Sequence, residues 1–367
     1  MVQPRPGIAL CLSGGGYRAM LFHLGALWRL NELAFLPTLA RISSVSGGSI
    51  TAGVLGRRWT TLAFVDDVAT RFTEEVVTPI RAMANETIDV GDILRGIVLP
   101  GTIGDKIAAS YNRLLFNGAT LQDLPDSPRF VINATNVQSG ALWRFSKPYM
   151  WDWRVGKVRS PRVELAVAVG ASSAFPPVLS PARLHVKDGD FEPGTGVDLQ
   201  KPPYTQDIYL TDGGVYDNLG LETAWKNYDT ILVSDGGGKM AADPEPHTDW
   251  VRHALRINEL TDNQVRSLRK RQVIGSYRAG ERKGTYWGVR SDMTDYPVAQ
   301  ALRCPDAQTG ELAAYPTRLA QVSDVTQQRL INWGYAICDA AMRAHVVPDA
   351  PAPSGFPYPA AGVGSAA

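Results

Sequence analysis

Three short segments of this chain combine residue types that could do chemistry. The first is Ser13-Gly14-Gly15-Gly16, which follows the short apolar run Ile8 to Leu12 and precedes an apolar pattern of helical period. A strand, a glycine loop and a helix start in succession bring several unpaired backbone N–H groups to one place. The segment therefore predicts a cradle for a negatively charged group.

The second segment places a serine at a tight turn. The β-compatible run Leu39 to Val45 meets Ser46-Gly47-Gly48 and then a second helix-compatible stretch. A nucleophilic serine needs small neighbours at such a turn, as in the G-x-S-x-G elbow, so that its hydroxyl stands clear of the sheet. Ser46 is thus a candidate nucleophile, although Ser44 takes the place of the elbow's first glycine.

The third kind of segment is an aspartate between a strand and a glycine turn, and it occurs twice. Asp212-Gly213-Gly214 follows the run Ile208 to Thr211, and Asp235 follows the strongly apolar run Tyr228 to Ser234 and precedes three more glycines. An Asp-Gly-Gly sequence alone is typical of an ordinary turn. Beside a serine elbow, either carboxylate is a candidate general base.

A nucleotide site is the main alternative for the glycine loop. Gly14-x-Gly16-x-x-Ala19 satisfies the loose dinucleotide fingerprint. That site also expects an acidic residue at the end of the second strand, whereas this strand ends in Ser46. A Walker-type loop does not fit either, because no Gly-Lys-Ser/Thr follows the glycines.

Taken together and in this order, Gly14 to Arg18, Ser46 and Asp212 to Gly214 resemble the patatin-like phospholipase family. The segment Ala171 to Pro177 is similar to the small-residue and proline stretch that this family carries before its aspartate. The resemblance spans roughly residues 7 to 240. It implies an α/β fold, a three-layer sandwich whose central, largely parallel sheet is flanked by helices.

The resemblance also implies a lipid acyl hydrolase acting on phospholipid or other fatty-acyl esters through a Ser-Asp dyad, without histidine, metal or cofactor. Ser46 is then the nucleophile and Asp212 the base, in preference to Asp235, because the tail Tyr216 to Gly220 also resembles the family motif. The oxyanion hole falls on Gly14, Gly15 and Gly16, and Arg18 is expected to contact the oxyanion region or a phosphate. Two alternatives stay open: a nucleotide-binding module without enzymatic activity, and a catalytically inactive lipid-binding protein.

Composition sets the remaining expectations. The 367 residues carry a formal net charge of +1, which gives no pull toward nucleic acid. Three scattered cysteines predict neither a disulfide framework nor a zinc site. No apolar run approaches the roughly 20 residues of a membrane span, so we expect a cytoplasmic protein with peripheral membrane contact at most. We expect one domain over residues 1–347, with the motifs in 7–240, an accessory region in 241–347 and a disordered tail in 348–367 rich in Pro, Ala and Gly.

Several stretches outside the motifs carry weaker signals. Tyr17 to Leu36 has helical period, and residues 61–127 predict short helices and loops, within which Ile88 to Phe116 is either a flap over an acyl pocket or core. Val163 to Val169 fits a strand or a helix. Residues 252–290 hold ten Lys and Arg against three acidic residues, which favours either a solvated helix face or a surface for anionic headgroups or a nucleotide.

Overall fold

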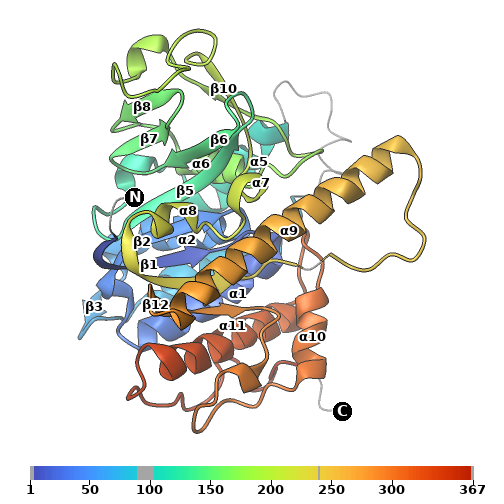
Figure 1. Ribbon diagram of the computed structural model, residues 1–367. Coiled ribbons are helices and arrows are strands. Elements are labelled where there is room, and N and C mark those ends of the chain that lie inside the picture. Colours follow the sequence, from blue (N-terminus) through green and yellow to red (C-terminus); the bar gives the residue numbers. More distant parts are fainter. Residues whose placement is uncertain (1–3, 89–102, 239, 365–367) are drawn as a thin grey trace.

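The computed structural model describes residues 4–88, 103–238 and 240–364, and within them a mixed sheet of ten strands forms the centre of the molecule (Figure 1). The strands of this sheet are β1 (Arg5–Leu12), β2 (Leu39–Val45), β5 (Arg129–Asn136), β6 (Ala141–Phe145), β7 (Tyr149–Asp152), β8 (Gly156–Arg159), β9 (Ala182–His185), β10 (Asp207–Asp212), β11 (Tyr228–Asp235) and β12 (Lys283–Gly288). A separate hairpin joins β3 (Phe64–Val65) to β4 (Val68–Ala69).

The sheet has a parallel half and an antiparallel half. In the order β12-β11-β1-β2-β5 every neighbouring pair is parallel. Beyond β5 the strands β6, β7 and β8 continue as an antiparallel meander, and β10 and β9 pair antiparallel on the other side of β5. The central, largely parallel sheet expected from the sequence is therefore confirmed.

Helices cover both faces of the parallel strands, as β1 requires. Its alternate residues point to opposite faces, and Leu10 and Leu12 lie in one apolar cluster while Ala9 and Cys11 lie in another. The first cluster is closed by α1 and α11, and the second by α8 and α9 (Figure 1). Because both faces of this parallel strand are buried, its sequence from Ile8 to Leu12 is a continuous apolar run. The chain is the expected three-layer sandwich.

The helices described are α1 (Gly16–Glu32), α2 (Gly47–Arg58), α3 (Thr78–Ala84), α5 (Ile103–Tyr111), α6 (Leu165–Ser172), α7 (Gly214–Asp217), α8 (Glu222–Trp225), α9 (Trp250–Arg278), α10 (Asp306–Ala314) and α11 (Asp324–His345). Short 3₁₀ or π turns are η1 (Leu36–Thr38), η2 (Trp59–Thr61), η3 (Thr73–Val77), η4 (Asn112–Phe116), η5 (Leu121–Asp123), η6 (Asp188–Asp190) and η7 (Met293–Asp295). The open choice at residues 163–169 is settled as the start of helix α6.

The C-terminal helix α11 packs closely on α1. A Cβ on Gly25 of α1 would overlap the backbone of Ile331, and one on Gly334 of α11 would overlap the backbone of Phe22. Only glycine at these positions lets the two helices approach backbone to backbone. With β12 paired to β11, the region expected to be accessory supplies one edge strand and one buried helix of the sandwich.

Two segments differ from, or fall outside, their sequence expectations. Residues 348–364 were expected to be disordered, but the Asn332 side chain donates to the carbonyl oxygens of Tyr358 and Gly362 at 2.8 and 2.7 Å, and Val363 is buried. The prediction from composition did not hold here, because hydrogen bonds from Asn332 of α11 fix a segment that has little apolar bulk. The expected flap at Ile93-Leu94 and Ile97 to Leu99 lies outside the described residues, whereas Ile107 and Tyr111 of α5 are fully buried in the core.

Candidate active site

Ser46 lies at the turn between β2 and α2, where its backbone has a φ of 50° and a ψ of −121°. This conformation is sparsely populated by residues with a Cβ, and it projects the side chain beyond the end of the strand. Val45 and Gly47 on either side are buried, whereas Ser46 is half-buried. The turn therefore presents the Ser46 hydroxyl at the carboxyl edge of the sheet.

Glycines allow this turn to pack directly on the glycine loop. A Cβ on Gly47 would overlap the carbonyl oxygen of Gly16, and a Cβ on Gly48 would lie 2.5 Å from the carbonyl oxygen of Leu12. The Gly48 N–H donates to the carbonyl oxygen of Ser13 at 3.1 Å. The two motifs found in the sequence thus form one continuous wall, with the loop backbone beside the serine.

Ser44, the departure from the elbow pattern, is accommodated in the interior. Its side chain is fully buried, and its hydroxyl accepts a hydrogen bond from the Ser49 hydroxyl at 3.0 Å. The position therefore takes a small polar residue without disturbing the turn at Ser46.

Asp212 reaches Ser46 because β2 and β10 meet end to end along one edge of β5. The parallel strand β2 makes its last pair between Val45 and Asn133, and the antiparallel strand β10 makes its last pair between Asp212 and Ala134. Since Asn133 and Ala134 are adjacent, the residue after Val45 lies next to Asp212. The Ser46 hydroxyl lies near enough to the Asp212 carboxyl group to lower its pKa.

The Asp212 carboxyl group lies in a dry setting with few polar partners. Its side chain is 3% exposed, and one oxygen accepts the Gly214 N–H at 2.7 Å. Burial raises the pKa of Asp212 to about 7, against the opposing effects of the hydrogen bonds from Gly214 and Ser46. A carboxylate whose conjugate acid has a pKa near neutrality is a far better proton acceptor than an ordinary aspartate.

Ser172 holds the serine turn and the aspartate turn together. Its hydroxyl accepts the Ser46 backbone N–H at 2.9 Å and donates to the Asn133 carbonyl oxygen at 2.6 Å. Its own carbonyl oxygen accepts the Gly213 N–H at 3.3 Å. The sequence pointed to the segment Ala171 to Pro177 only by resemblance, and nothing in the residues identified Ser172 as the member with this role.

The glycine loop has fewer available donors than the sequence suggested. The Gly14 N–H donates to the carbonyl oxygen of Asn218 at 3.0 Å, so it is not available as an oxyanion donor. Within residues 4–88, 103–238 and 240–364, the Gly15 and Gly16 amides have no backbone acceptor. Of the three glycines expected to form the oxyanion hole, Gly14 thus has its N–H bound by the turn after β10, and Gly15 and Gly16 remain the candidate donors.

Arg18 lies in the first turn of α1 and is 2% exposed. Its guanidinium donates to three carbonyl oxygens, those of Gly236, Ala313 and Tyr315, at 3.1, 3.4 and 2.6 Å. Burial, followed by repulsion from Arg290, lowers the pKa of Arg18 to about 10. One nitrogen, Nη2, has no hydrogen-bond partner among the described residues, which leaves one donor for a bound group.

Asp235 directs its hydrogen bonds elsewhere. Its carboxylate accepts from the Tyr286 hydroxyl at 2.7 Å and from the Gly237 N–H at 2.9 Å. Its charge also raises the pKa values of Arg18 and Arg290 relative to burial alone. The rival aspartate therefore belongs to a cationic cluster beside β12.

His23 is the histidine nearest to the glycine loop in sequence, and it has a packing role. Its Nδ1 hydrogen-bonds the Ser234 hydroxyl at 2.8 Å and its Nε2 hydrogen-bonds the Ser13 carbonyl oxygen at 3.0 Å. Burial lowers the pKa of His23 to about 4. The neutral ring joins α1 to the ends of β1 and β11.

Comparison with protein-family models shows that the segments carrying these residues match a known family. A family model described as patatin-like phospholipase matches residues 10–225, more than half of the chain. The chain belongs to the patatin-like phospholipase family. The matched range includes the glycine loop, Ser46 and Asp212, and it ends before Asp235.

Solved structures similar to this family member include human GIVD cytosolic phospholipase A2 in complex with methyl gamma-linolenyl fluorophosphonate, at 15% identity and a TM-score of 0.53. A second structure of that enzyme, with the same inhibitor and terbium chloride, gives 14% and 0.52, and both cover 91% of this chain and 57% of the other. VipD from Legionella pneumophila matches at 15% identity with a TM-score of 0.37, covering 94% of this chain and 68% of the other. The likeness to the two phospholipase A2 structures shows the fold.

This chain spans little more than half the length of the cytosolic phospholipase chains that it matches. No curated protein matches it in sequence. Across residues 4–88, 103–238 and 240–364, no helix has both the length and the hydropathy to pass through a bilayer.

Proposed function

We propose that this patatin-like protein hydrolyses fatty-acyl esters, with Ser46 as nucleophile and Asp212 as general base. The observation that carries the proposal is the strand register that brings Ser46 beside Asp212, a buried carboxyl group whose pKa is raised to about 7 and is lowered in part by the Ser46 hydroxyl. A nucleophilic serine requires an adjacent base, and a carboxylate in this place supports that role without a histidine.

In the first half of the reaction, the Ser46 oxygen attacks the ester carbonyl carbon while Asp212 takes the hydroxyl proton. The carbonyl oxygen becomes an oxyanion, stabilised by the Gly15 and Gly16 N–H groups at the start of α1. The tetrahedral intermediate then collapses. The bond to the alcohol oxygen breaks, the proton on Asp212 goes to that oxygen, and the acyl group remains on Ser46.

In the second half, water replaces the alcohol. Asp212, again a carboxylate, takes a proton from water, whose oxygen attacks the acyl carbonyl carbon. The Ser46 oxygen leaves with the proton held by Asp212, and the fatty acid is released. Each half-reaction returns Asp212 to its starting protonation state.

The substrate class that we infer is a phospholipid or similar fatty-acyl ester. The related human phospholipase A2 binds a fluorophosphonate that carries a linolenyl chain, which is a lipid chain on a serine-reactive group. Arg18 Nη2 is the proposed contact for an anionic part of the substrate, because burial makes an unpaired guanidinium nitrogen costly without a partner. We place this activity in the cytoplasm at anionic membrane surfaces, where reducing conditions suit three free, buried cysteines.

Covalent labelling tests this function directly. A long-chain fluorophosphonate should modify the protein, and peptide mapping should find the adduct on Ser46. Ser46→Ala should abolish labelling, whereas Ser49→Ala, a serine three residues along in α2, should retain it. An adduct on Ser44 or Ser49 in the wild-type protein would sink the assignment.

The same experiment separates the two alternatives from the enzyme. A protein that takes no label but binds nucleotides would be the binding module suggested by Gly14-x-Gly16-x-x-Ala19. A protein that takes no label but binds lipid would be a catalytically inactive member of the family.

A further inference from the structure

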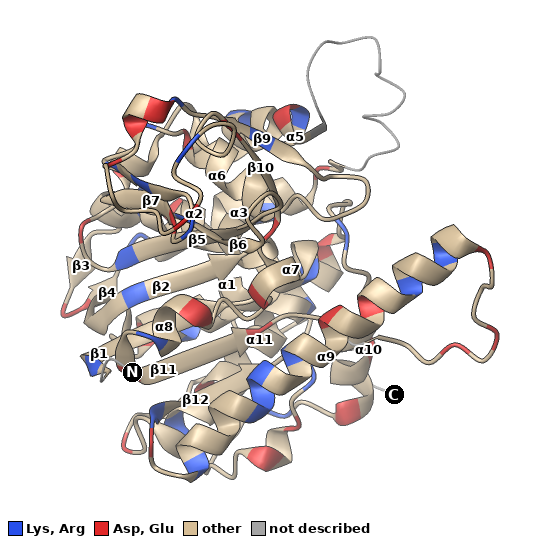
Figure 2. Ribbon diagram, turned by 45° about the horizontal axis from the view of Figure 1, so that its top comes forward, with Lys and Arg blue, Asp and Glu red and all other residues tan. Residues whose placement is uncertain are grey.

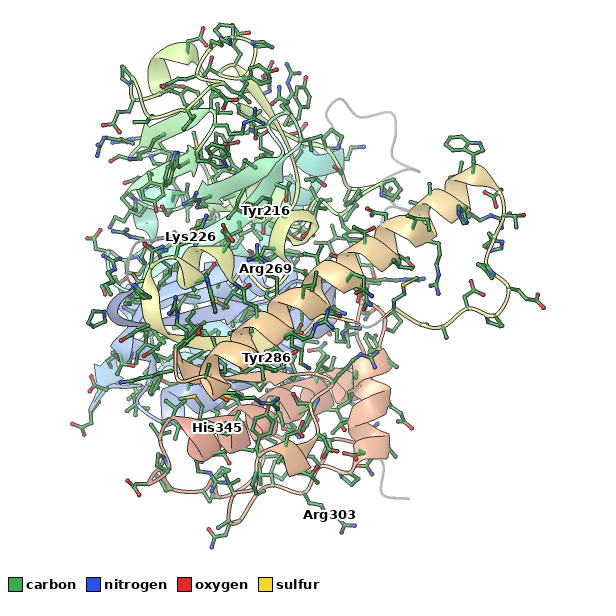
Figure 3. The ribbon with its side chains drawn as sticks, viewed as in Figure 1. Tyr216, Lys226, Arg269, Tyr286, Arg303 and His345 are labelled. Carbon is green, nitrogen blue, oxygen red and sulfur yellow. The ribbon has the colours of Figure 1, made fainter. Side chains whose placement is uncertain are left out.

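Helix α9 is anchored to the body only along its C-terminal half. There Arg269, which Figure 3 labels, forms an ion pair with Glu222 at 3.1 Å. Val273 is fully buried, and the Tyr277 hydroxyl donates to the Ile231 carbonyl oxygen at 2.7 Å. Toward its N-terminus the helix extends beyond the body (Figure 1). Residues 250–261 are exposed, except for the half-buried Arg256. Half of a long helix therefore stands in solvent.

One side of this helix carries large apolar side chains that point away from the body. They are Trp250, Leu268, Ile257 and Leu260, which are 82, 57, 48 and 45% exposed. At about 100° per residue these four lie within about 80° of one another on the helix circumference. The anchoring residues Arg269 and Val273 lie on the opposite side. We call the four side chains the outer apolar face of α9.

The outer apolar face differs from the apolar stripe of an ordinary surface helix, which turns toward the core. Val251 and Leu255, at 46 and 39% exposure, are also exposed, but they lie on the same side of the helix as Arg269 and Val273. Large apolar side chains gathered on one exposed side of a helix mark a place where something else binds. The outer apolar face therefore requires an occupant.

The charges of α9 decide between a second copy of the chain and a lipid surface. Residues 250–278 contain seven Lys and Arg against two acidic residues, and Lys and Arg recur along the helix (Figure 2). Arg271 is exposed, and its position places it on the same side as Leu268, one turn further on. Three of the seven cations are already paired, Arg252 with Asp249, Arg256 with Glu259 and Arg269 with Glu222. Two such helices packed together would bring the other like charges, Arg271 among them, toward one another, whereas an anionic bilayer would neutralise them. A Trp at the exposed end suits the headgroup boundary.

The anchored half of α9 also lies beside the candidate active site. The Arg266 guanidinium packs against Gly237, and the Asn218 amide nitrogen approaches the same glycine. Asn218 in turn accepts the Gly14 N–H with its carbonyl oxygen at 3.0 Å. A surface bound to α9 is thereby held close to the edge of the sheet that carries Ser46.

We propose that the outer apolar face of α9 docks this protein on anionic lipid surfaces, with Trp250, Ile257 and Leu268 entering the headgroup boundary. The inference deepens the proposed function, and it rests on that function only for the idea that the lipid surface is the source of substrate. The docking itself depends on the exposure and charge of α9 alone.

Vesicle co-sedimentation tests the docking, with Ser46→Ala as the background so that no lipid is consumed. The test variant is Trp250→Ser/Ile257→Ser/Leu268→Ser. The matched control is Val65→Ser/Val197→Ser/Val325→Ser, three valines outside α9 with exposures of 58, 73 and 48%. On vesicles of phosphatidylcholine and phosphatidylglycerol, the test variant should bind about 100-fold more weakly than its background, and the control should be unchanged.

The charge contribution is tested by Arg271→Glu and by salt. On the same vesicles this variant should bind about tenfold more weakly. Raising the ionic strength to about 1 M shortens the screening length to about 3 Å and should bring binding down to the level seen with phosphatidylcholine alone. If added salt leaves the vesicle binding of the parent unchanged and Arg271→Glu binds as tightly as the parent, an anionic lipid surface is not the occupant.

Hydrolysis of a short-chain, water-soluble ester distinguishes failure of the docking from failure of the proposed function. It is measured on the wild-type protein and on the test variant with Ser46 retained. If the test variant loses vesicle binding and keeps this hydrolysis, both stand. If the parent binds vesicles through the outer apolar face but hydrolyses no ester, the docking stands and the proposed function falls. Vesicle binding that survives in the test variant overturns the docking. So does a dimer that the test variant dissociates while vesicle binding stays unchanged, because a second copy is then the occupant.

Discussion

Asp212 and Asp235 lie in the same kind of strand-to-glycine turn, but different groups surround their carboxyl groups. Asp212 ends strand β10 and Asp235 ends strand β11, and glycines follow each of them. In both turns the N–H of the second glycine donates to the aspartate carboxyl group, from Gly214 at 2.7 Å and from Gly237 at 2.9 Å. Asp212 has the Ser46 hydroxyl near enough to lower its pKa, and burial is the largest influence on that pKa. Asp235 has the Tyr286 hydroxyl and the charges of Arg18 and Arg290 nearby.

The comparison separates what a local motif decides from what its neighbours decide. The Asp-Gly-Gly turn accounts for the backbone hydrogen bond at both sites. Asp235 lies among groups whose own pKa values it raises, those of Arg18 and Arg290. No cation is among the groups that shift the pKa of Asp212, and burial leaves that pKa near neutrality. This difference is the ground on which we propose Asp212 as the base.

The largest expected effect is the contrast between Asp212→Asn and Asp235→Asn in ester hydrolysis. Asn at 212 keeps the shape but cannot take the Ser46 proton, so kcat should fall about 10⁴-fold, as for the acid of a serine protease. Asn at 235 should cost less than about tenfold. Rates on a short-chain ester measure both, and a larger loss at 235 than at 212 would reverse the assignment.

The pH dependence should follow Asp212 alone. Because its carboxylate form is the active one and its pKa is about 7, kcat/KM should rise with pH to a plateau above about 8 and fall to about 1% of the plateau at pH 5. Asp235→Asn should keep the same midpoint. An activity that is flat from pH 5 to 9 contradicts this.

Ser172→Ala should lower kcat by about tenfold with little change in KM, since Ser172 positions the Ser46 turn without touching substrate. Ser172→Thr retains the hydroxyl and should restore part of the loss. Ser173→Ala, next along the chain, removes a hydroxyl that donates to the Val169 carbonyl oxygen and serves as the control. Equal losses at 172 and 173 would indicate general damage to α6.

Stability should respond to the two aspartates with opposite signs. The folded-state pKa of Asp212 lies above its ordinary value, so the stability linked to this group is present below about pH 4 and is lost as the pH rises through 7. Asp212→Asn should therefore gain stability relative to wild type between pH 4 and pH 8, by up to about 4 kcal/mol for a shift of about three units.

Asp235→Asn removes the charge that offsets Arg18 and Arg290 and should lower the free energy of unfolding by about 3 kcal/mol at pH 8. Urea unfolding at pH 4 and pH 8 measures the free energy of unfolding of both variants. If, relative to wild type, Asp235→Asn becomes more stable or Asp212→Asn becomes less stable on going to pH 8, the electrostatic contrast between the two aspartates is wrong.

The sequence by itself determined the candidate pieces of the site and the strands that carry them. Runs of apolar and β-compatible residues marked β1, β2, β10 and β11, and the glycines and small residues after them marked the turns. These features are local, because a continuous apolar run records burial on both faces and a glycine records a backbone that no side chain can share. Resemblance to the family then supplied an order for the motifs and the three-layer fold.

Only the tertiary structure decided which of these pieces meet. The approach of Asp212 to Ser46 depends on the register of β2 and β10 on β5, and register between distant strands is set by the whole sheet. The loss of the Gly14 amide to Asn218 and the role of Ser172 are likewise contacts between segments far apart in sequence. The direction of α9 belongs here too. Its amphipathic pattern is visible in the residues, but which side faces solvent depends on where Arg269 and Val273 find their partners.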